Sequence, residues 1–508
     1  MDDTAARYAR FLQLVHEVHD LGSAMGLLEW DQEIMMPPRG VQGRARVRAT
    51  VAALMHDRMV DPELGELVAT LAGTAAADPG AFDPWARANL RELKRQRDRA
   101  VKVPRQLVAD LAREGSLAQQ AWVEARAKDD WARFAPHLAR LVDLKRREAQ
   151  AVGYATEPYD ALLDEYEPGA RAADLAQLFA QLRDGLVPIL DALREAPHPP
   201  ADAAWRGAFT AADQDRLGRA VLDAMGYDFA AGRLDVSAHP FTQGLGPGDV
   251  RITTRYDAAD LRPALYATMH EGGHALYELG LPGEHAGEPV GSAVSLGIHE
   301  SQSRLWENLV GRSRPFVAWL APQLAGIWPA AYGGADPEAL YRAANTVRPS
   351  LIRIEADEVT YNLHIILRLE IERALVAGEV EVDGLPSLWR EKVKAYLGLD
   401  VPSDREGVLQ DIHWSFGLFG YFPTYALGNL YASQLFAAAR RHLPDLDAQL
   451  ARGELAGLLG WLRANVHGPG SLYPAGELCV RVTGQELSPE PFLAHVRAKF
   501  GDVYGVSL

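Results

Sequence analysis

The stretch Ala267-Thr268-Met269-His270-Glu271-Gly272-Gly273-His274-Ala275-Leu276-Tyr277-Glu278 holds two histidines four positions apart, with a glutamate directly after the first. On an α-helix, residues i and i+4 lie on one face, about 6 Å apart along the axis. Both imidazoles can therefore reach one metal ion, and Glu271 can reach a water bound to that ion. This is the H-E-x-x-H arrangement of zinc hydrolases.

Two glycines lie between these histidines. Each glycine in a helix interior costs about 1 kcal/mol relative to alanine, so an ordinary helix does not favour Gly272 and Gly273. Glycine does suit a place where another backbone or a substrate comes close. Coincidence is the alternative, because the chain has 15 histidines and 68 acidic residues. The glycines favour a metal site over coincidence.

Length and composition restrict the class of protein. The 508 residues, 48% hydrophobic and 24% charged, are typical of a globular chain with a sizeable core. The formal net charge of −16 argues against a nucleic-acid partner. The single cysteine, Cys479, excludes an intrachain disulfide and suits a small buried apolar position. The start Met1-Asp2-Asp3-Thr4 does not resemble a signal peptide, and no apolar run reaches membrane-spanning length. We therefore expect a cytoplasmic protein that does not bind membranes.

Apolar residues recur at helical spacing through most of the chain. A first helix is expected from Thr4, and a second pattern runs through Leu27 and Leu28 to Trp30 and ends before Pro37-Pro38. Further helices are expected at 40–73, 83–99, 104–128, 130–152, 258–280, 294–312, 336–347, 350–378, 385–398, 423–443, 455–467 and 489–499. With no repeat and no domain-sized shift in composition, the sequence predicts a mainly α protein with one catalytic domain over 1–508.

One region departs from the helical pattern. Residues 233–237 and 250–256 alternate and are β-branched, which predicts short strands immediately before the helix with the two histidines. We expect a small antiparallel sheet beside that helix. Its edge could accept an extended peptide as an additional strand.

A catalytic zinc ion needs a third protein ligand and an open position for water. The next expected helix contains His299 and Glu300, and Glu300 follows His274 by 26 residues, enough for a turn and a return. Neighbouring residues on a helix point about 100° apart, so only one of the two is expected to be a ligand. The spacing alone leaves both open.

These residues belong to a wider set of short motifs in a characteristic order. The chain resembles the carboxypeptidase Taq family of zinc metallocarboxypeptidases, and the match extends over nearly the whole sequence. Besides residues 270–274, the matching motifs are His239-Pro240-Phe241, Asp249-Val250-Arg251-Ile252-Thr253, His299-Glu300-Ser301, Ile352-Arg353-Ile354-Glu355-Ala356-Asp357 and Gly407-Val408-Leu409-Gln410-Asp411-Ile412-His413-Trp414. An N-terminal Trp30-Asp31-Gln32-Glu33 with Met36-Pro37-Pro38 also resembles the family.

The resemblance implies one zinc ion per chain, with His270, His274 and Glu300 as ligands and Glu271 as general base. Cobalt or manganese could occupy the same ligands. A metal lowers the pKa of its bound water towards about 7. The base takes a proton from that water and passes it to the departing amine.

Donors to the developing oxyanion are expected from a segment after residue 410. There His413 is the clearest candidate. Tyr421 is favoured over Tyr425, although both would also fit an aromatic core. Gly417 and Gly420 predict mobility for this segment, as for a loop that closes over substrate.

An exopeptidase must also recognise the free C-terminal carboxylate. Arg353 is predicted to bind it, because a planar guanidinium matches both carboxylate oxygens. We expect Arg353 on the same helix as Tyr361 and His364, and His364 as a packed core residue. Arg348 and Arg251 are alternatives for the carboxylate. Further predicted substrate-binding residues are Asp249, Arg251 and His239.

The resemblance implies a carboxypeptidase of broad specificity for short peptides, most often a homodimer. It also implies a helical body divided by a deep substrate groove, of which the N-terminal helices, roughly 1–200, form one wall or lid. One alternative is an H-E-x-x-H oligopeptidase that cuts inside short peptides. The other is a helical peptide-binding scaffold without catalysis, which the intact Glu271 argues against.

Overall fold

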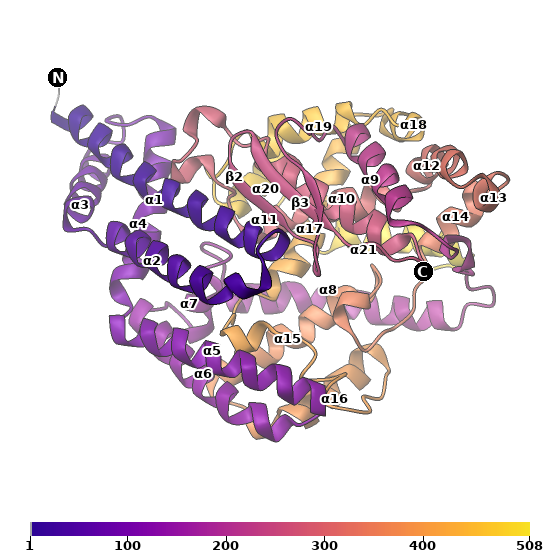
Figure 1. The fold of residues 1–508 in the computed structure, drawn as a ribbon, viewed down its shortest axis with the longest axis horizontal. Helices are drawn as coiled ribbons and strands as arrows, with labels where there is room; N and C mark the ends of the chain where they lie inside the picture. The colour runs from indigo at the N-terminus through magenta and orange to yellow at the C-terminus, as the bar shows by residue number, and fades with distance from the viewer. Residues whose placement is uncertain (1–2) are drawn as a thin grey trace.

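The computed structural model describes residues 3–508, which form a mainly helical body (Figure 1). The first helices of the chain are α1 (Asp3–Ile34), α2 (Val41–Met59), α3 (Pro62–Ala77), α4 (Pro84–Lys102), α5 (Arg105–Lys128), α6 (Trp131–Val152), α7 (Pro158–Leu163), α8 (Ala172–Arg194) and α9 (Ala211–Met225). After the sheet follow α10 (Arg262–Glu278), α11 (Leu296–Arg304), α12 (Arg314–Ile327), α13 (Pro329–Tyr332), α14 (Pro337–Ala344), α15 (Tyr361–Ala377) and α16 (Leu385–Leu397). The last are α17 (Pro423–His442), α18 (Leu446–Arg452), α19 (Ala456–Leu462), α20 (Ala475–Thr483) and α21 (Glu490–Tyr504).

The small sheet consists of β1 (Leu234–Val236), β2 (Thr242–Gly246) and β3 (Asp249–Thr254), in the order β1-β3-β2. β2 and β3 form an antiparallel hairpin, whereas β1 pairs parallel with β3. The prediction of an antiparallel sheet is therefore wrong for β1, because the chain crosses to the far edge of β3 before it turns back. β2 was not predicted, since a strand with two glycines and few β-branched residues carries little strand signal.

Three of the expected helices differ most from the structure. α1 is a single helix of 32 residues rather than two patterns. The expected helix 40–73 is interrupted at Asp61, whose side chain caps α3 by accepting the Glu63 amide at 2.7 Å. The expected helix 350–378 begins only at Tyr361, because Asp357 accepts the amides of the two residues that precede α15.

The hydrophobic core has two parts. A small cluster joins α1, α3 and α4 through residues such as Phe11, Leu64 and Leu90. The main cluster begins at Ala118 on α5 and continues to the last helix. The first four helices thus lie outside the main core, and Figure 1 shows them together at one side of the molecule.

Helix α10 lies against the sheet, α9 and α11. Thr268 on α10 donates a hydrogen bond to Thr254 on β3, with 3.0 Å between the hydroxyl oxygens. Pro263 occupies the first turn of α10, where its missing N–H costs nothing. The helix with the two histidines is therefore held on several sides by buried elements.

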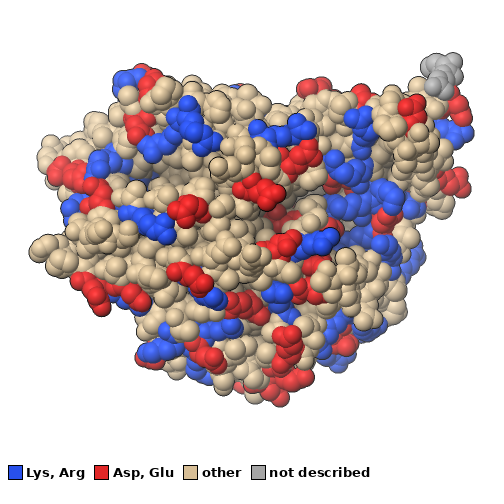
Figure 2. Space-filling model, turned by 180° about the vertical axis from the view of Figure 1, so that it is seen from behind, with Lys and Arg blue, Asp and Glu red and all other residues tan. Residues whose placement is uncertain are grey.

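The surface carries charges of both signs, and Figure 2 shows acidic and basic side chains intermixed over one face. Many form exposed pairs such as Lys94–Asp98 and Arg481–Glu477. Exposed pairs of this kind contribute about 0–1 kcal/mol each, so the fold depends mainly on its cores. Within residues 3–508, no helix is both long enough and apolar enough to cross a membrane.

Candidate metal centre

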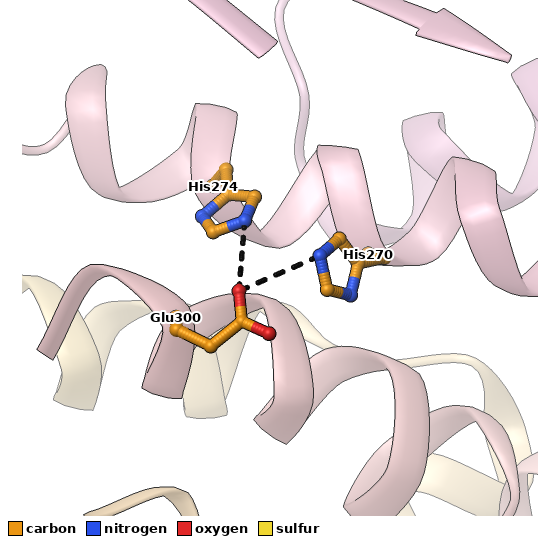
Figure 3. Close-up of side chains that lie close together, drawn as sticks. All are labelled: His270, His274 and Glu300. Carbon is orange, nitrogen blue, oxygen red and sulfur yellow. Dashed lines mark ion pairs between the residues drawn. The ribbon is translucent and has the colours of Figure 1, made fainter. Parts of the chain in front are cut away.

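The structure brings His270, His274 and Glu300 together between α10 and α11 (Figure 3). Glu300 Oε2 lies 3.3 Å from His274 Nε2 and 3.6 Å from His270 Nε2. Ligand atoms about 2.0–2.1 Å from a tetrahedral zinc ion are about 3.3 Å apart, so these spacings suit one ion. Two imidazole nitrogens and one carboxylate oxygen also form a typical donor set for catalytic zinc.

His299, the competing ligand candidate, points elsewhere. Its Nε2 lies 2.8 Å from Glu278 Oε1. Its ring packs against the ring of His274, with 4.5 Å between the centroids. Glu300 therefore shares the space between the two histidines, and His299 lies beside it.

Glycines allow the helices around this centre to approach closely. A Cβ on Gly273 would lie 2.6 Å from the Gln302 carbonyl oxygen of α11, and one on Gly272 would lie 2.7 Å from Leu222 of α9. A Cβ on Gly428 of α17 would lie 2.4 Å from the Glu300 Cγ. Such separations leave no room for a methyl group. The expectation that the motif glycines admit a neighbouring backbone is confirmed for Gly273.

Further hydrogen bonds orient two of the three side chains, Glu300 and His270. Arg304 Nε donates to Glu300 Oε1 at 2.7 Å, which leaves Oε2 directed at the histidines. Glu307 Oε2 lies 3.0 Å from His270 Nδ1 and thereby directs the ring's Nε2 towards Glu300. Glu307 belongs to a π-helical turn, Leu305–Gly311, that continues α11. Turns of this kind are rare and occur often at functional sites.

The electrostatics of the centre suit a bound cation. Burial raises the pKa of Glu300, but Arg304 and the two histidines outweigh it and hold that pKa well below its usual value. Burial lowers the pKa of His274 to about 3. Glu300 is thus ionised and His274 neutral, and these are the forms that bind metal. The residues present fit a divalent cation.

Glu271 follows His270 on α10 and is 7% exposed. Its Oε2 accepts a hydrogen bond of 2.7 Å from the Thr242 hydroxyl of β2. Burial raises the pKa of Glu271. Thr242 was not predicted from the sequence, although it directly follows the His239-Pro240-Phe241 motif.

His413, Tyr421 and Tyr425 form one group. His413 Nε2 lies 3.2 Å from the Tyr425 hydroxyl, and the two tyrosine rings are 5.5 Å apart. Tyr425 lies about one turn before Gly428, which contacts Glu300, so this group borders the metal centre. Burial lowers the pKa of His413 to about 4, and the His413 Nδ1 has no hydrogen-bond partner among the described residues.

The segment between His413 and Tyr421 is packed rather than open. Gly417 and Gly420 both have a positive φ, of 72° and 91°. A Cβ on Gly420 would lie 2.7 Å from the backbone of Leu162 in α7. Both glycines therefore provide a backbone conformation that other residues disfavour, and Gly420 also permits a close approach to α7; the mobility expected from the sequence stays a prediction.

Arg353 lies in a short 3₁₀ turn, Arg353–Glu355, and the prediction that it lies on a helix is wrong. Its Nε donates to Asp411 Oδ1 at 2.9 Å, and its NH1 donates to the Tyr361 hydroxyl at 3.0 Å. The guanidinium carbon lies 5.0 Å from the ring centroid of Tyr425. Arg353 therefore borders the same aromatic group as His413. His364 is fully buried, as expected.

The other predicted substrate-binding residues lie in or near the sheet. Asp249 and Arg251 pair with each other through two contacts of 2.8 Å. Arg251 also stacks on Trp30 of α1, with its guanidinium carbon 4.6 Å from the ring centroid. The contact between Arg251 and Trp30 joins α1 to the sheet. None of these contacts involves a residue of the metal centre. His239 is exposed, and its carbonyl accepts a hydrogen bond from Ser237.

Comparison with known proteins agrees with this geometry. The family model described as carboxypeptidase Taq (M32) metallopeptidase matches residues 10–500. Thermostable carboxypeptidase 1 of Thermus thermophilus is 45% identical and aligns with 98% of this chain and 99% of its own length. Carboxypeptidase 1 of Bacillus subtilis is 36% identical over 97% of this chain and 98% of its own.

Solved structures give the same result. The M32 carboxypeptidase from Deinococcus radiodurans superposes with a TM-score of 0.94 at 40% identity, covering 99% of this chain and all of its own. Metallocarboxypeptidase 1 of Trypanosoma cruzi gives a TM-score of 0.93 at 35% identity, covering 97% and 99%. The chain therefore belongs to the carboxypeptidase Taq (M32) family and is a metallocarboxypeptidase.

Proposed function

We propose that this metallocarboxypeptidase uses one zinc ion, held by His270, His274 and Glu300, to remove single residues from short peptides. Its preference among C-terminal side chains is broad. The observation that carries the proposal is the convergence of three ligand atoms within 4.8 Å of one another, beside the buried carboxylate of Glu271. When bound, the cation supplies Lewis-acid chemistry that polarises the peptide carbonyl and makes water more acidic.

Glu271 moves the proton in this proposal. Because the Thr242 hydroxyl occupies Oε2, Oε1 remains free to take a proton from the attacking water. A buried carboxylate with a raised pKa accepts that proton more readily than an exposed one. It can then deliver the proton to the nitrogen of the departing amino acid.

His413 and the two tyrosines stabilise the charge that develops on the carbonyl oxygen. Burial raises the pKa of Tyr421 and Tyr425, so each keeps the phenolic proton that it would donate. With its ring proton on Nε2, neutral His413 can donate to the Tyr425 hydroxyl oxygen, 3.2 Å away, and so orient that hydroxyl. The single O–H of Tyr425 then remains available to the carbonyl oxygen.

Arg353 binds the substrate carboxylate. A guanidinium has five N–H groups, and the contacts with Asp411 and Tyr361 use one on each of its three nitrogens. One N–H therefore remains on each terminal nitrogen, which is the pair needed for a bidentate contact with a carboxylate. Asp411 and Tyr361 fix the orientation of this pair.

The assay that tests the proposal compares a short peptide with its C-terminally amidated twin, using metal-loaded protein. Arg353→Ala should lower kcat/KM on the free peptide about 10- to 100-fold, since hydrogen bonds to charged groups contribute about 1.5–3 kcal/mol. If the amidated peptide is cleaved at all, the rate of its cleavage should not change. Arg348, one of the alternative arginines, gives the comparison: Arg348→Ala should leave both rates unchanged, because its side chain is 62% exposed and pairs with Asp202.

The alternatives predict different results in this assay. Equal losses on both peptides would favour an oligopeptidase that cuts internally. Failure of the metal-loaded protein to release any free amino acid would favour a binding scaffold.

We also propose a substrate groove with α1–α4 on one wall and a homodimer in solution. Support for a dimer comes from α2, none of whose residues is buried. With the end of α1 it exposes Leu27, Met35, Val41, Val47 and Leu54, by 44–55% each. Light scattering should report twice the chain mass, and Leu54→Glu should reduce it to that of one chain. A dimer that survives this change would exclude this face as the interface.

A further inference from the structure

A buried carboxylate beneath the His413 segment has no part in the proposed chemistry. Glu372 on α15 is 0% exposed. Its Oε1 accepts a hydrogen bond of 2.8 Å from the Trp414 indole N–H. Its Oε2 accepts hydrogen bonds from the Gly420 amide at 3.0 Å and from the Tyr159 hydroxyl at 2.6 Å.

Two of these donors are at opposite ends of one segment. Trp414 directly follows His413, and Gly420 directly precedes Tyr421. The Glu372 side chain therefore forms hydrogen bonds near both ends of residues 413–421. This segment carries His413 and Tyr421, two of the groups proposed to stabilise the carbonyl oxygen. The third donor, Tyr159, belongs to α7, against which Gly420 packs. Glu372 thus connects the segment to two helices at once.

The same helix also supports the proposed carboxylate-binding arginine. One turn before Glu372, Arg368 Nε donates to Asp411 Oδ2 at 2.8 Å. The other oxygen of Asp411 accepts from Arg353. Two successive turns of α15 therefore fix Arg353 and the His413 segment relative to each other.

We propose that Glu372 is a positioning residue, which holds His413 and Tyr421 in place for the reaction through its bonds to Trp414 and Gly420. The inference rests on the proposed roles of His413 and Tyr421. Glu372 itself does not touch substrate or metal.

A purely structural role explains the site less well. All three hydrogen-bonding partners of Glu372 are neutral donors, and burial raises its pKa to about 7. Arg368 is the charged group that most lowers this pKa, and Arg368 is itself paired with Asp411. A buried carboxylate without its own cation is costly for stability. Its hydrogen bonds offset that cost only while the segment remains in this position.

The test replaces Glu372 with glutamine, which keeps the shape but presents an amide N–H₂ to one of the donors. We expect kcat to fall about 10- to 100-fold, because misplacement of catalytic groups by 1 Å can cost about 10²-fold. Metal content should not change, and KM should change less than kcat. Amide exchange in the 413–421 peptide should become faster. Glu370→Gln is the matched control, since Glu370 lies on the same helix but pairs with Arg183 and Lys392.

A double-mutant cycle separates positioning from general stability. In a His413→Ala, Tyr421→Phe background, Glu372→Gln should lower the remaining kcat by less than about 3-fold if it acts through these residues. The inference would be overturned if Glu372→Gln lowered kcat equally in the wild-type and the double-variant background. An unchanged kcat in the Glu372→Gln single variant would also overturn it. If Glu372→Gln does not fold, Trp414→Phe, which removes only the indole donor, is judged by the same criteria. A background variant with wild-type kcat would instead contradict the proposed roles of His413 and Tyr421.

Discussion

Replacing Gly428 with alanine tests the arrangement of the metal centre most directly. Gly428 lies inside α17, facing Glu300 of α11. The added Cβ would lie 2.4 Å from the Glu300 Cγ and 2.7 Å from its Cβ. Carbon atoms in contact are normally about 3.5–4.0 Å apart, so α11 or the Glu300 stem must move by about 1 Å.

The size of the effect follows from two opposing contributions. Alanine in a helix interior is favoured over glycine by about 1 kcal/mol, whereas overpacking a core costs about 1–3 kcal/mol. We therefore expect the metal-free protein to lose about 0–2 kcal/mol of unfolding free energy. Metal ligands must keep their positions within about 0.2 Å. A shift of about 1 Å at Glu300 should therefore weaken metal binding more than it weakens the fold. Changes around ligands typically cost about 10- to 100-fold in affinity.

The measurement is a metal-binding titration against a competing chelator, together with thermal unfolding of both metal-free and metal-loaded protein. Gly73→Ala in α3 is the matched control, because nothing lies within 4 Å of its added Cβ. It should leave metal affinity unchanged and stabilise the fold slightly. Wild-type metal affinity in Gly428→Ala would show that Glu300 is not a ligand or that the contact relaxes freely.

Substitutions at three further side chains test individual roles. Glu271→Gln should retain the metal and lower kcat by at least about 10²-fold; near-normal turnover would exclude Glu271 as the general base. Thr242→Val removes the hydroxyl that orients Glu271 and should lower kcat about 10-fold, with recovery in Thr242→Ser. An equal rate in both Thr242 variants would exclude that orienting role. Glu167 tests the effect of pH on stability, because burial raises its pKa from 4.5 to about 8. The contribution of Glu167 to the free energy of unfolding is fully present below pH 4.5. It is lost as the pH rises through about 8, because the folded state then gives up its extra proton. Glu167→Gln should therefore gain about 2–4 °C in melting temperature relative to wild type between about pH 5 and about pH 9. Glu370→Gln should show no such trend, and a constant difference for Glu167→Gln would contradict the raised pKa.

Local patterns allowed much of the helical body to be predicted. Helical periodicity identified most of the helices, because an amphipathic helix shows its buried face within a dozen residues. It failed where a side chain rather than periodicity decides where a helix begins, as at Asp357 before α15. Strand β2 was missed because its two glycines weaken a pattern that is already short.

For the site, the sequence by itself determined the two histidines and the glutamate of α10, since spacing along one helix is a local property. Spacing left His299 and Glu300 as alternatives, and the family resemblance implied Glu300. The tertiary structure directs His299 to Glu278 and Glu300 to the two histidines. The contacts of Thr242 with Glu271 and of Glu372 with the His413 segment were also beyond the sequence. Each joins residues more than 25 positions apart. No local pattern encodes such pairs, because the packing of whole helices and strands decides which distant side chains meet.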